Sequence, residues 1–119
     1  MFWYNTAGDD GNGAAGGAIE TITDLNWAED IIDTVPAGFA RNYGAAFAGQ
    51  GTLASAAGAA VSTAFVESAG GTAVAAQFTF GGHTYVAQDT IADGMLVDAN
   101  DLLFDITGVT GTISSTRFV

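Results

Sequence analysis

The spacing of apolar residues changes along the chain and distinguishes two kinds of segment. Residues 18–34, 73–87 and 102–106 carry short β-branched and aromatic runs, often alternating with polar positions, a pattern typical of strands. Residues 52–67 instead place apolar side chains three and four positions apart, which predicts a helix of about four turns. The pattern therefore favours a mainly β domain with one packed α-helix at about residues 52–67.

Small residues mark the ends of the predicted helix. Gly51 and Thr52 open it with a capping residue, and Gly70-Gly71 closes it. Gly58 lies inside the helix, where glycine costs roughly 1 kcal/mol relative to alanine. We therefore expect Gly58 to lie where the helix packs closely on a sheet.

Two adjacent glycines predict a hairpin in the last third of the chain. Gly81-Gly82-His83 separates the strand-like residues 73–80 and 84–87, and glycines permit the positive φ angles of a tight turn. His83, the single histidine, is expected to be exposed in this turn.

Residues 18–34 are predicted to form two short strands around an acidic turn at residues 26–30. The side chains expected to point into the core from these strands are Ile19, Ile22, Leu25 and Ile31. Pro36-Ala37-Gly38 ends this segment. The chain therefore divides into residues 1–35 and 36–119, which are expected to pack as one unit because the whole chain is long enough for only one small core.

The charge balance excludes two classes of partner. Of the 119 residues, 13 are Asp or Glu and only two are basic, Arg41 and Arg117, so the formal net charge is −11. Phosphate backbones and anionic membranes repel such a surface, so we expect no nucleic-acid partner and no membrane binding. The longest apolar stretch, residues 52–66, is too short and too polar for membrane insertion.

Clustered acidic residues and glycines predict that calcium neutralises part of this charge. The chain has no cysteine, so a bound metal is expected to replace the disulfides of a small extracellular domain. Calcium takes about six to eight oxygen ligands, many of them from flexible turns, and the turn at residues 8–13 offers such oxygens. The predicted ligands are Asp9, Asp10, Asn12, Asp24, Asp30 and Asp33. The alternative is an ordinary Asx-rich turn, since the order of an EF-hand loop is missing.

A second acidic group follows the hairpin. Asp89, Asp93, Asp98 and Asp101 surround Gly94. The same chemistry allows a second calcium ion there, although a solvated loop before the next strand is the favoured interpretation.

The residues needed for common catalytic mechanisms are scarce. The chain has one histidine, no cysteine and no lysine, and no motif places a base beside a nucleophile. One histidine without an H-E-x-x-H motif does not make a zinc site. We therefore expect that the protein is not an enzyme.

Two blocks of the sequence resemble the C-terminal region of RTX proteins. The run Tyr4–Asp10 followed by Ile22–Asp33 is similar to the last turn and exit strand of a calcium-binding β-roll. Residues Phe78–Val86 and Leu102–Gly111 are similar to segments near the C-termini of serralysin-type domains, RTX adhesins and surface-layer proteins. The full nine-residue repeat of the roll is absent, and Arg117 stands where such termini are acidic or neutral.

The resemblance implies a fold and a function. Residues 1–35 would form the last β-roll-like turn with its exit strands, and residues 36–119 a C-terminal capping and secretion domain; the fold would be the end of a calcium β-roll or a small β-sandwich. The protein would be secreted and extracellular, either free in the medium or held at the cell surface. Its partners would be the type I secretion machinery and either upstream repeats or neighbouring copies. Phe118 and Val119 resemble the apolar end of the secretion signal.

Two other functions stay open. Val74–Phe80 and Leu102–Ile106 are nearly uncharged, and an exposed strand of this kind can add to a neighbour's sheet, as in a self-assembling surface-layer or filament subunit. A carbohydrate-binding module would need exposed aromatic residues, for which Trp3, Trp27 and Tyr43 are the candidates, although core or edge positions are favoured for them.

Overall fold

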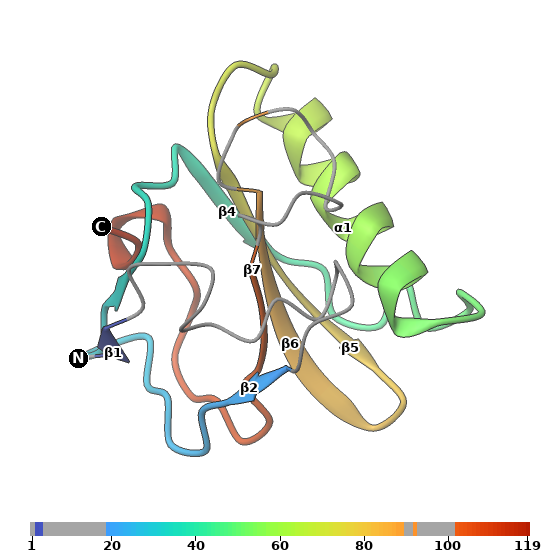
Figure 1. The fold of residues 1–119 in the computed structure, drawn as a ribbon, viewed down its shortest axis with the longest axis horizontal. Coiled ribbons are helices and arrows are strands. Elements are labelled where there is room, and N and C mark those ends of the chain that lie inside the picture. The colour runs from blue at the N-terminus through green and yellow to red at the C-terminus, as the bar shows by residue number, and fades with distance from the viewer. Residues whose placement is uncertain (1, 4–18, 90–91, 93–101) are drawn as a thin grey trace.

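The computed structural model describes residues 2–3, 19–89, 92 and 102–119, which form a mixed β-sheet with one α-helix on one face (Figure 1). The strands are β1 (Phe2–Trp3), β2 (Glu20–Thr21), β3 (Ile32–Asp33), β4 (Phe39–Asn42), β5 (Val74–Phe80), β6 (His83–Asp89) and β7 (Leu102–Asp105), the helix is α1 (Leu53–Glu67), and a 3₁₀ turn covers Ser115–Arg117. The main sheet has the order β2-β7-β6-β5-β4, and β1 pairs with β3 separately.

The prediction of the helix is confirmed, including its first turn. The Thr52 side chain accepts a hydrogen bond from the Ser55 backbone N–H at 3.1 Å, which satisfies one of the free donors at the helix start. At the other end, Gly70 N–H donates to Phe65 C=O and Ala69 N–H donates to Val66 C=O. These two bonds form a Schellman cap.

The expected role of Gly58 is wrong. A Cβ atom built on Gly58 meets no described atom within 4 Å outside the helix's own backbone, so the described part of the sheet does not require a glycine there. The helix approaches the sheet through alanines instead. Ala56, Ala57, Ala60 and Ala64 are fully buried, and an alanine side chain is short enough for close packing.

The predicted hairpin is confirmed and is tighter than expected. Gly81 and Gly82 have φ angles of 58° and 82°, and together they form the whole two-residue turn between β5 and β6. Positive φ at both positions fits the twist of the paired strands and favours glycine. His83 is the first residue of β6 and not part of the turn.

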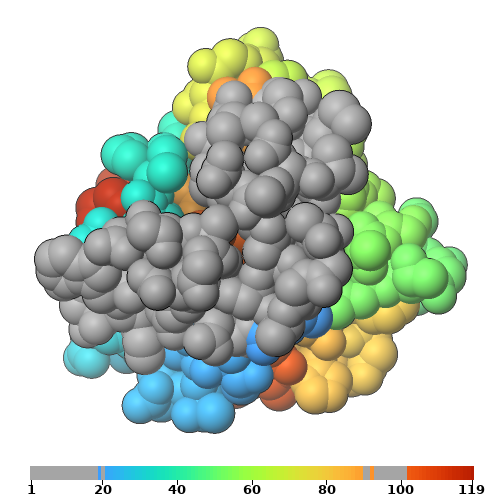
Figure 2. Space-filling view, in the orientation of Figure 1, coloured from blue at the N-terminus to red at the C-terminus, as the bar shows by residue number. Residues whose placement is uncertain are grey.

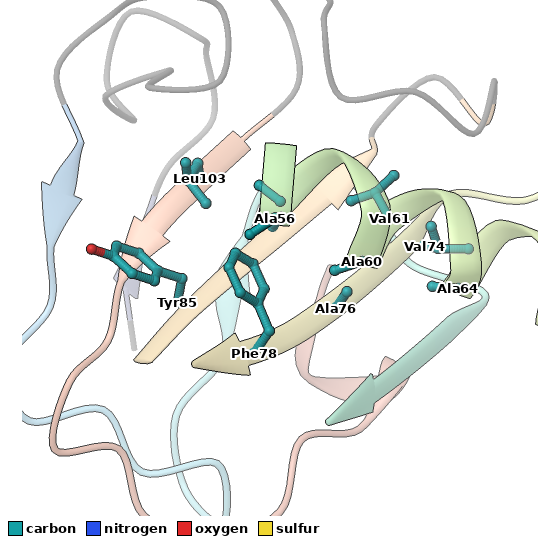
Figure 3. Close-up of a cluster of buried hydrophobic side chains, with 11 residues drawn as sticks. Ala56, Ala60, Val61, Ala64, Val74, Ala76, Phe78, Tyr85 and Leu103 are labelled. Carbon is teal, nitrogen blue, oxygen red and sulfur yellow. The ribbon is translucent and has the colours of Figure 1, made fainter. Parts of the chain in front are cut away.

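Strand alternation separates two buried clusters on the two faces of the sheet. The helix-face cluster contains Val74, Ala76 and Phe78 of β5, Tyr85 and Ala87 of β6, Leu103 of β7 and the buried side of α1 (Figure 3). The second-face cluster takes the intervening strand residues, including Ala75, Val86, Leu102 and Phe104. Register explains this division, because β5 and β6 pair Phe78 with Tyr85 and Ala76 with Ala87 on the same face.

The second face of the sheet is covered by residues 22–35 and 106–119, which we call the second-face layer. It has little regular secondary structure, yet it buries Ile22, Leu25, Trp27, Ile32, Ile106, Ile113 and Phe118. The rings of Trp27 and Phe118 pack with centroids 5.5 Å apart. The layer thus contributes most of the bulky side chains of the second-face cluster.

The two parts of the layer run in parallel. Beyond the pairing of β2 with β7, isolated bridges join Asn26 to Thr110 and Ile32 to Phe118, both in parallel orientation. β1 pairs in parallel with β3 on the other side of Ile32. Residues far apart in the sequence therefore form a parallel ladder of β1, β3 and residues 118–119.

Several expectations about the strands need correction. The two strands expected within residues 18–34 do not pair with each other, because β2 joins β7 and β3 joins β1. Ile22 and Leu25 are buried as expected, but Ile32 takes the fully buried position in place of Ile31.

The fold class is confirmed only in its coarse form. A small domain with a mixed sheet and one packed helix is present, and its helix gives it a roughly α/β character. The segments Val74–Phe80 and Leu102–Ile106, expected to be available for a neighbour, contain β5 and β7, which lie inside the sheet between other strands.

Candidate functional site

The predicted calcium ligands fall into two groups. Asp9, Asp10 and Asn12 lie outside the described residues. Asp24 is exposed in a bend after β2, and Asp33 is half-buried in β3. Within the described part of the chain, no three His, Asp or Glu side chains lie close enough together to hold a metal ion. The described residues therefore do not by themselves bring Asp24, Asp30 and Asp33 into one calcium site.

Asp30 has a structural role in the acidic turn. Its Oδ2 atom accepts a hydrogen bond from the Asn26 N–H at 2.8 Å. The Asn26 side chain in turn accepts from Ala28 N–H at 3.0 Å, and Asn26 C=O accepts from Asp30 N–H at 2.7 Å. These bonds are those of a turn in which short polar side chains bond to nearby backbone. The alternative of an Asx-rich turn thus describes residues 26–30 well.

The second acidic group is described at only one position. Asp89 is the last residue of β6 and is fully buried, opposite Val74 on the helix face. Asp93, Asp98 and Asp101 lie outside the described residues. The expectation that Asp89 belongs to a solvated loop is wrong, because strand β6 extends two residues beyond Ala87 and carries Asp89 into the interior.

A cluster of hydrogen-bonded polar side chains lies at the tip of the hairpin, where His83 meets the end of β7. His83 Nδ1 lies 2.9 Å from Asp105 Oδ2. Asp105 Oδ1 accepts from the Thr107 hydroxyl at 2.6 Å and from Thr107 N–H at 3.0 Å. Thr107 Oγ1 also accepts from Thr84 N–H at 3.1 Å. The cluster therefore joins the start of β6 to the turn that follows β7, next to each other at the lower edge of the molecule (Figure 2).

The electrostatics of this cluster favour an ionised carboxylate. Burial alone would raise the pKa of Asp105, but hydrogen bonds from Thr107 and His83 outweigh it and hold the pKa below its ordinary value of 3.8. Burial, together with the Asp105 charge, raises the pKa of Tyr85, whose ring centroid lies 6.0 Å from that of His83. An ionised carboxylate only accepts hydrogen bonds, so His83 Nδ1 is the donor in this pair.

The cluster lacks the arrangement of a nucleophile and its base. The Thr107 hydroxyl lies 3.3 Å from His83 Nδ1, the nitrogen that donates to Asp105, so this nitrogen has no lone pair with which to accept the hydroxyl proton. In a catalytic triad the hydroxyl and the carboxylate contact opposite nitrogens of the ring. The cluster therefore fits a role in holding the hairpin to β7.

A second charged cluster connects the end of α1 to β4. Glu67 forms an ion pair with Arg41 and accepts a hydrogen bond from the Tyr43 hydroxyl. Burial, followed by the hydrogen bond to Glu67 and its charge, raises the pKa of Tyr43 above its ordinary value of 10.0. The Arg41 guanidinium also lies 5.2 Å from the centre of the Tyr43 ring. The Arg41 and Glu67 side chains are 55% and 33% exposed, and such a surface ion pair contributes little to stability.

The residues named for secretion are part of the folded layer. Phe118 is buried at 2% exposure against Trp27, whereas Val119 is 45% exposed. Val119 pairs through its backbone, with its N–H donating to Ile32 C=O and its C=O accepting from Thr34 N–H. Arg117 donates to Ala28 C=O at 2.9 Å. Any receptor that binds the Phe118 side chain must therefore bind a chain in which Phe118 is not packed against Trp27.

The aromatic residues considered for carbohydrate binding do not form an exposed platform among the described residues. Trp27 is 1% exposed, and its indole N–H donates to the Gln77 side chain at 2.8 Å. Tyr43 is half-buried and engaged with Glu67. The side chain of Trp3 lies outside the described part of the structure.

The sequence analysis missed the partners of His83. A signal was present, because residues 84–87 and 102–106 are both predicted strands, and the register that pairs Tyr85 with Asp105 places position 83 opposite position 107. The motif Asp105-x-Thr107 before Gly108 is also typical of a side-chain-bonded turn. Neither signal is decisive without the register of β6 and β7.

No family model matches the chain, and comparisons with curated proteins and with solved structures found no match. Within the described residues, no helix is long and apolar enough to cross a membrane.

Proposed function

We propose that this domain is the non-catalytic C-terminal cap and type I secretion-signal region of an extracellular calcium-binding repeat protein. The observation that carries the proposal is the parallel ladder of β1, β3 and residues 118–119. Rolls and solenoids stack parallel strands, and the last one needs a cover that differs from the repeats. In this domain, β1 pairs with β3 on one side, and no described residue pairs with its other side.

The ladder supports a cap because its two sides differ: β1 lies on one side of β3, and residues 118–119 lie on the other. An upstream strand would add to β1 in the orientation that β1 already has relative to β3. On the far side of β3, Phe118 and Val119 occupy the next position, and Phe118 packs on Trp27. The cap would therefore accept a repeat on one side and close the stack with its own core on the other.

The calcium part of the proposal follows from the charge. A net charge of −11 disfavours a compact state unless cations neutralise it. Extracellular modules bind calcium with dissociation constants of about 10⁻⁴ to 10⁻³ M, so export to a calcium-rich medium would favour the folded state by mass action. Asp24, Asp30 and Asp33 would contribute together with Asp9, Asp10 and Asn12.

The calcium test compares thermal unfolding of the full chain in calcium, in magnesium and in chelator. Calcium alone is expected to raise the melting temperature, and replacing Asp24 and Asp33 with Asn is expected to reduce that increase. Glu29→Gln is the matched control, because Glu29 is an exposed acidic residue of the same segment that is not a predicted ligand. A melting temperature that is the same in calcium and chelator would remove calcium from the proposal.

The export test separates recognition from stability. The full chain is expressed with a type I exporter, and the fraction in the medium is measured for three proteins. Val119→Ser is expected to lower export, because it changes an exposed side chain of the predicted signal. Trp27→Ala removes a buried side chain of the second-face cluster but leaves Phe118 and Val119 of the predicted signal unchanged. Its export is therefore expected to equal that of the wild type. Equal export of the wild type and Val119→Ser would contradict a signal at Val119.

A second candidate, self-assembly in a surface layer or filament, is favoured by one observation. Among the described residues, β4 pairs only with β5 and forms an edge of the sheet, and an edge strand can pair with another chain. Light scattering at increasing protein concentration, with and without calcium, tests this candidate. A monomer at all concentrations would count against it and leave the cap unaffected.

A further inference from the structure

The second-face layer, residues 22–35 and 106–119, is bonded within itself. Trp27 N–H donates to Thr110 C=O at 2.9 Å, and Thr110 N–H donates to Leu25 C=O at 3.1 Å. At the other end, Thr34 N–H donates to Val119 C=O at 2.8 Å. The tilted contact between the Trp27 and Phe118 rings joins the two halves between these points. All of these contacts would persist if the layer moved as a body.

At the start of its second half the layer stays bonded to β6, where Ile106 N–H donates to Thr84 C=O at 2.8 Å and Thr107 Oγ1 accepts from Thr84 N–H at 3.1 Å. Elsewhere the described residues of the layer bond to β5 and β6 through glutamine side chains. The Trp27 indole N–H donates to Gln77, and Gln88 accepts from the Thr34 hydroxyl at 2.7 Å and donates to Val35 C=O at 2.6 Å. Gln77 and Gln88 are the only two Gln residues among the buried residues described, and both face the layer.

The part of this contact that β5 and β6 supply is suited to exposure in water. Besides the two glutamines, these strands offer Ala75 and Val86 to the layer, whereas the larger Leu102 and Phe104 of the second face belong to β7. Glutamine side chains recover hydrogen bonds from water when they are exposed, so β5 and β6 lose little when this contact opens.

The layer also has defined boundaries. Its second half leaves β7 through a turn at Thr107-Gly108, where Gly108 has a φ angle of 93°. Its first half ends at Pro36-Ala37-Gly38, before β4. The part it leaves behind includes residues 39–89, one continuous stretch that contains β4, α1, β5 and β6 (Figure 1), and Leu103 of β7 completes the helix-face cluster.

From this geometry we propose that the second-face layer detaches from β5 and β6 as a body while the helix-face cluster stays folded. Detachment breaks the side-chain bonds to Gln77 and Gln88, keeps the backbone bonds between the two halves of the layer, and exposes the second face of β5 and β6. This inference does not depend on the proposed function. If that function holds, the same motion is a step toward exposing Phe118.

Hydrogen exchange of the full chain tests the motion. It compares N–H groups that bond between the layer and β5 or β6 with N–H groups that bond within the layer or within α1. The Trp27 indole N–H and the Gln88 side-chain amide cross the contact. The backbone N–H groups of Trp27 and Thr110 lie within the layer, and that of Ala60 lies inside α1. The indole N–H is expected to exchange about tenfold or more faster than the backbone N–H of Trp27 or of Ala60.

Two results would overturn the proposal. Equal exchange rates for the Trp27 indole and Ala60 backbone N–H groups would show that the whole domain opens at once. A Trp27 backbone N–H that exchanges as fast as the indole N–H, with Ala60 still protected, would show that the layer unfolds instead of moving as a body.

A matched pair of variants gives an independent measurement. Gln77→Leu removes the acceptor of the Trp27 indole N–H, and Gln50→Leu makes the same change at an exposed glutamine before α1 that bonds to Ser55. In a Trp3→Phe background, Gln77→Leu is expected to increase quenching of Trp27 fluorescence by acrylamide several-fold, with unchanged helical circular dichroism. Gln50→Leu is expected to leave the quenching unchanged. Unchanged quenching in Gln77→Leu, or a parallel loss of helix signal, would contradict the proposal.

Discussion

The two faces of the sheet are covered in different ways. On the helix face, one regular element supplies a row of alanines against Phe78, Tyr85 and Leu103, all from nearby strands (Figure 3). On the second face, two segments separated by more than 70 residues supply Trp27, Phe118 and other bulky side chains from irregular backbone. The first face satisfies its backbone by helical hydrogen bonds, whereas the second relies on parallel bridges and buried glutamines.

This difference has a general lesson about how a small sheet is covered. A helix satisfies its backbone N–H and C=O groups with its own hydrogen bonds. To cover a sheet it therefore needs only small apolar side chains on the side that faces the sheet. An irregular layer must find a partner for each buried N–H and C=O group, and it uses the chain's other end for this purpose. The second face therefore depends on contacts of long sequence separation, and it forms only after both segments are in place.

The largest expected effect comes from removing one buried ring on each face. Phe78→Ala and Phe118→Ala are each expected to lower the free energy of unfolding by about 3–5 kcal/mol. Urea unfolding is followed by circular dichroism of α1 and by Trp27 fluorescence in a Trp3→Phe background. Phe78→Ala should shift both transitions, and Phe118→Ala should shift the fluorescence transition more than the helix transition. Identical shifts for Phe118→Ala would mean that the two faces unfold as one.

A glycine of the second face is expected to have the next largest effect. Gly111 has a φ angle of 79°, and an added Cβ would lie 3.0 Å from the Ala28 backbone nitrogen and 3.2 Å from Asn26 Oδ1. Gly111→Ala therefore combines an unfavourable backbone conformation with a close contact, and it should destabilise the protein by about 1–2 kcal/mol. Thermal unfolding measures the change in stability. An unchanged melting temperature would mean that the turn at residues 26–30 shifts to accommodate the Cβ atom at little cost.

The same substitution on the helix side is expected to have the opposite sign. Gly58 lies within α1, with no described atom outside the helix's own backbone near the position of a Cβ. Gly58→Ala should stabilise the protein by about 1 kcal/mol, because alanine restricts the unfolded chain and favours the helix. A destabilised Gly58→Ala variant would show that a close contact forms at this position after all.

The end of α1 offers a smaller gain. Ala69 has a φ angle of 67° in the Schellman cap, a conformation that glycine adopts at lower energy. Ala69→Gly should raise the free energy of unfolding by about 0.5–1 kcal/mol. The control is Ala54→Gly in the exposed side of α1, which should lower stability by about 1 kcal/mol. If both variants lose stability, the cap geometry does not determine the energy at residue 69.

The smallest effect at neutral pH is expected at the hairpin tip, because the His83 side chain is 54% exposed and water screens its pair with Asp105. The folded protein lowers the pKa of Asp105 from 3.8. The stability that this shift contributes is therefore present above pH 3.8 and is lost as pH falls through the lower, folded value. Melting temperatures measured downward from pH 5 should fall less steeply in Asp105→Asn than in the wild type. Parallel curves would show that Asp105 is not the group that titrates.

Much of the helix face could be predicted from local pattern. The spacing of apolar residues located α1, Thr52 located its cap, and two adjacent glycines located the hairpin. Each of these features is fixed by residues within a few positions of one another, so a local pattern carries the information. The polar cluster at the hairpin tip was less predictable: the sequence analysis expected only that His83 is exposed, because Asp105 and Thr107 join it through pairing between β6 and β7.

The sequence by itself determined the helix, the hairpin and the acidic charge. Only the tertiary structure decided that β2 pairs with β7 and β3 with β1, that Ile32 is buried in place of Ile31, and that Trp27 meets Phe118 and Gln77. The physical reason is the range of the interactions. Turn and helix preferences act between neighbours, whereas parallel pairing and buried hydrogen bonds are chosen by competition among all segments that can reach the same sheet face.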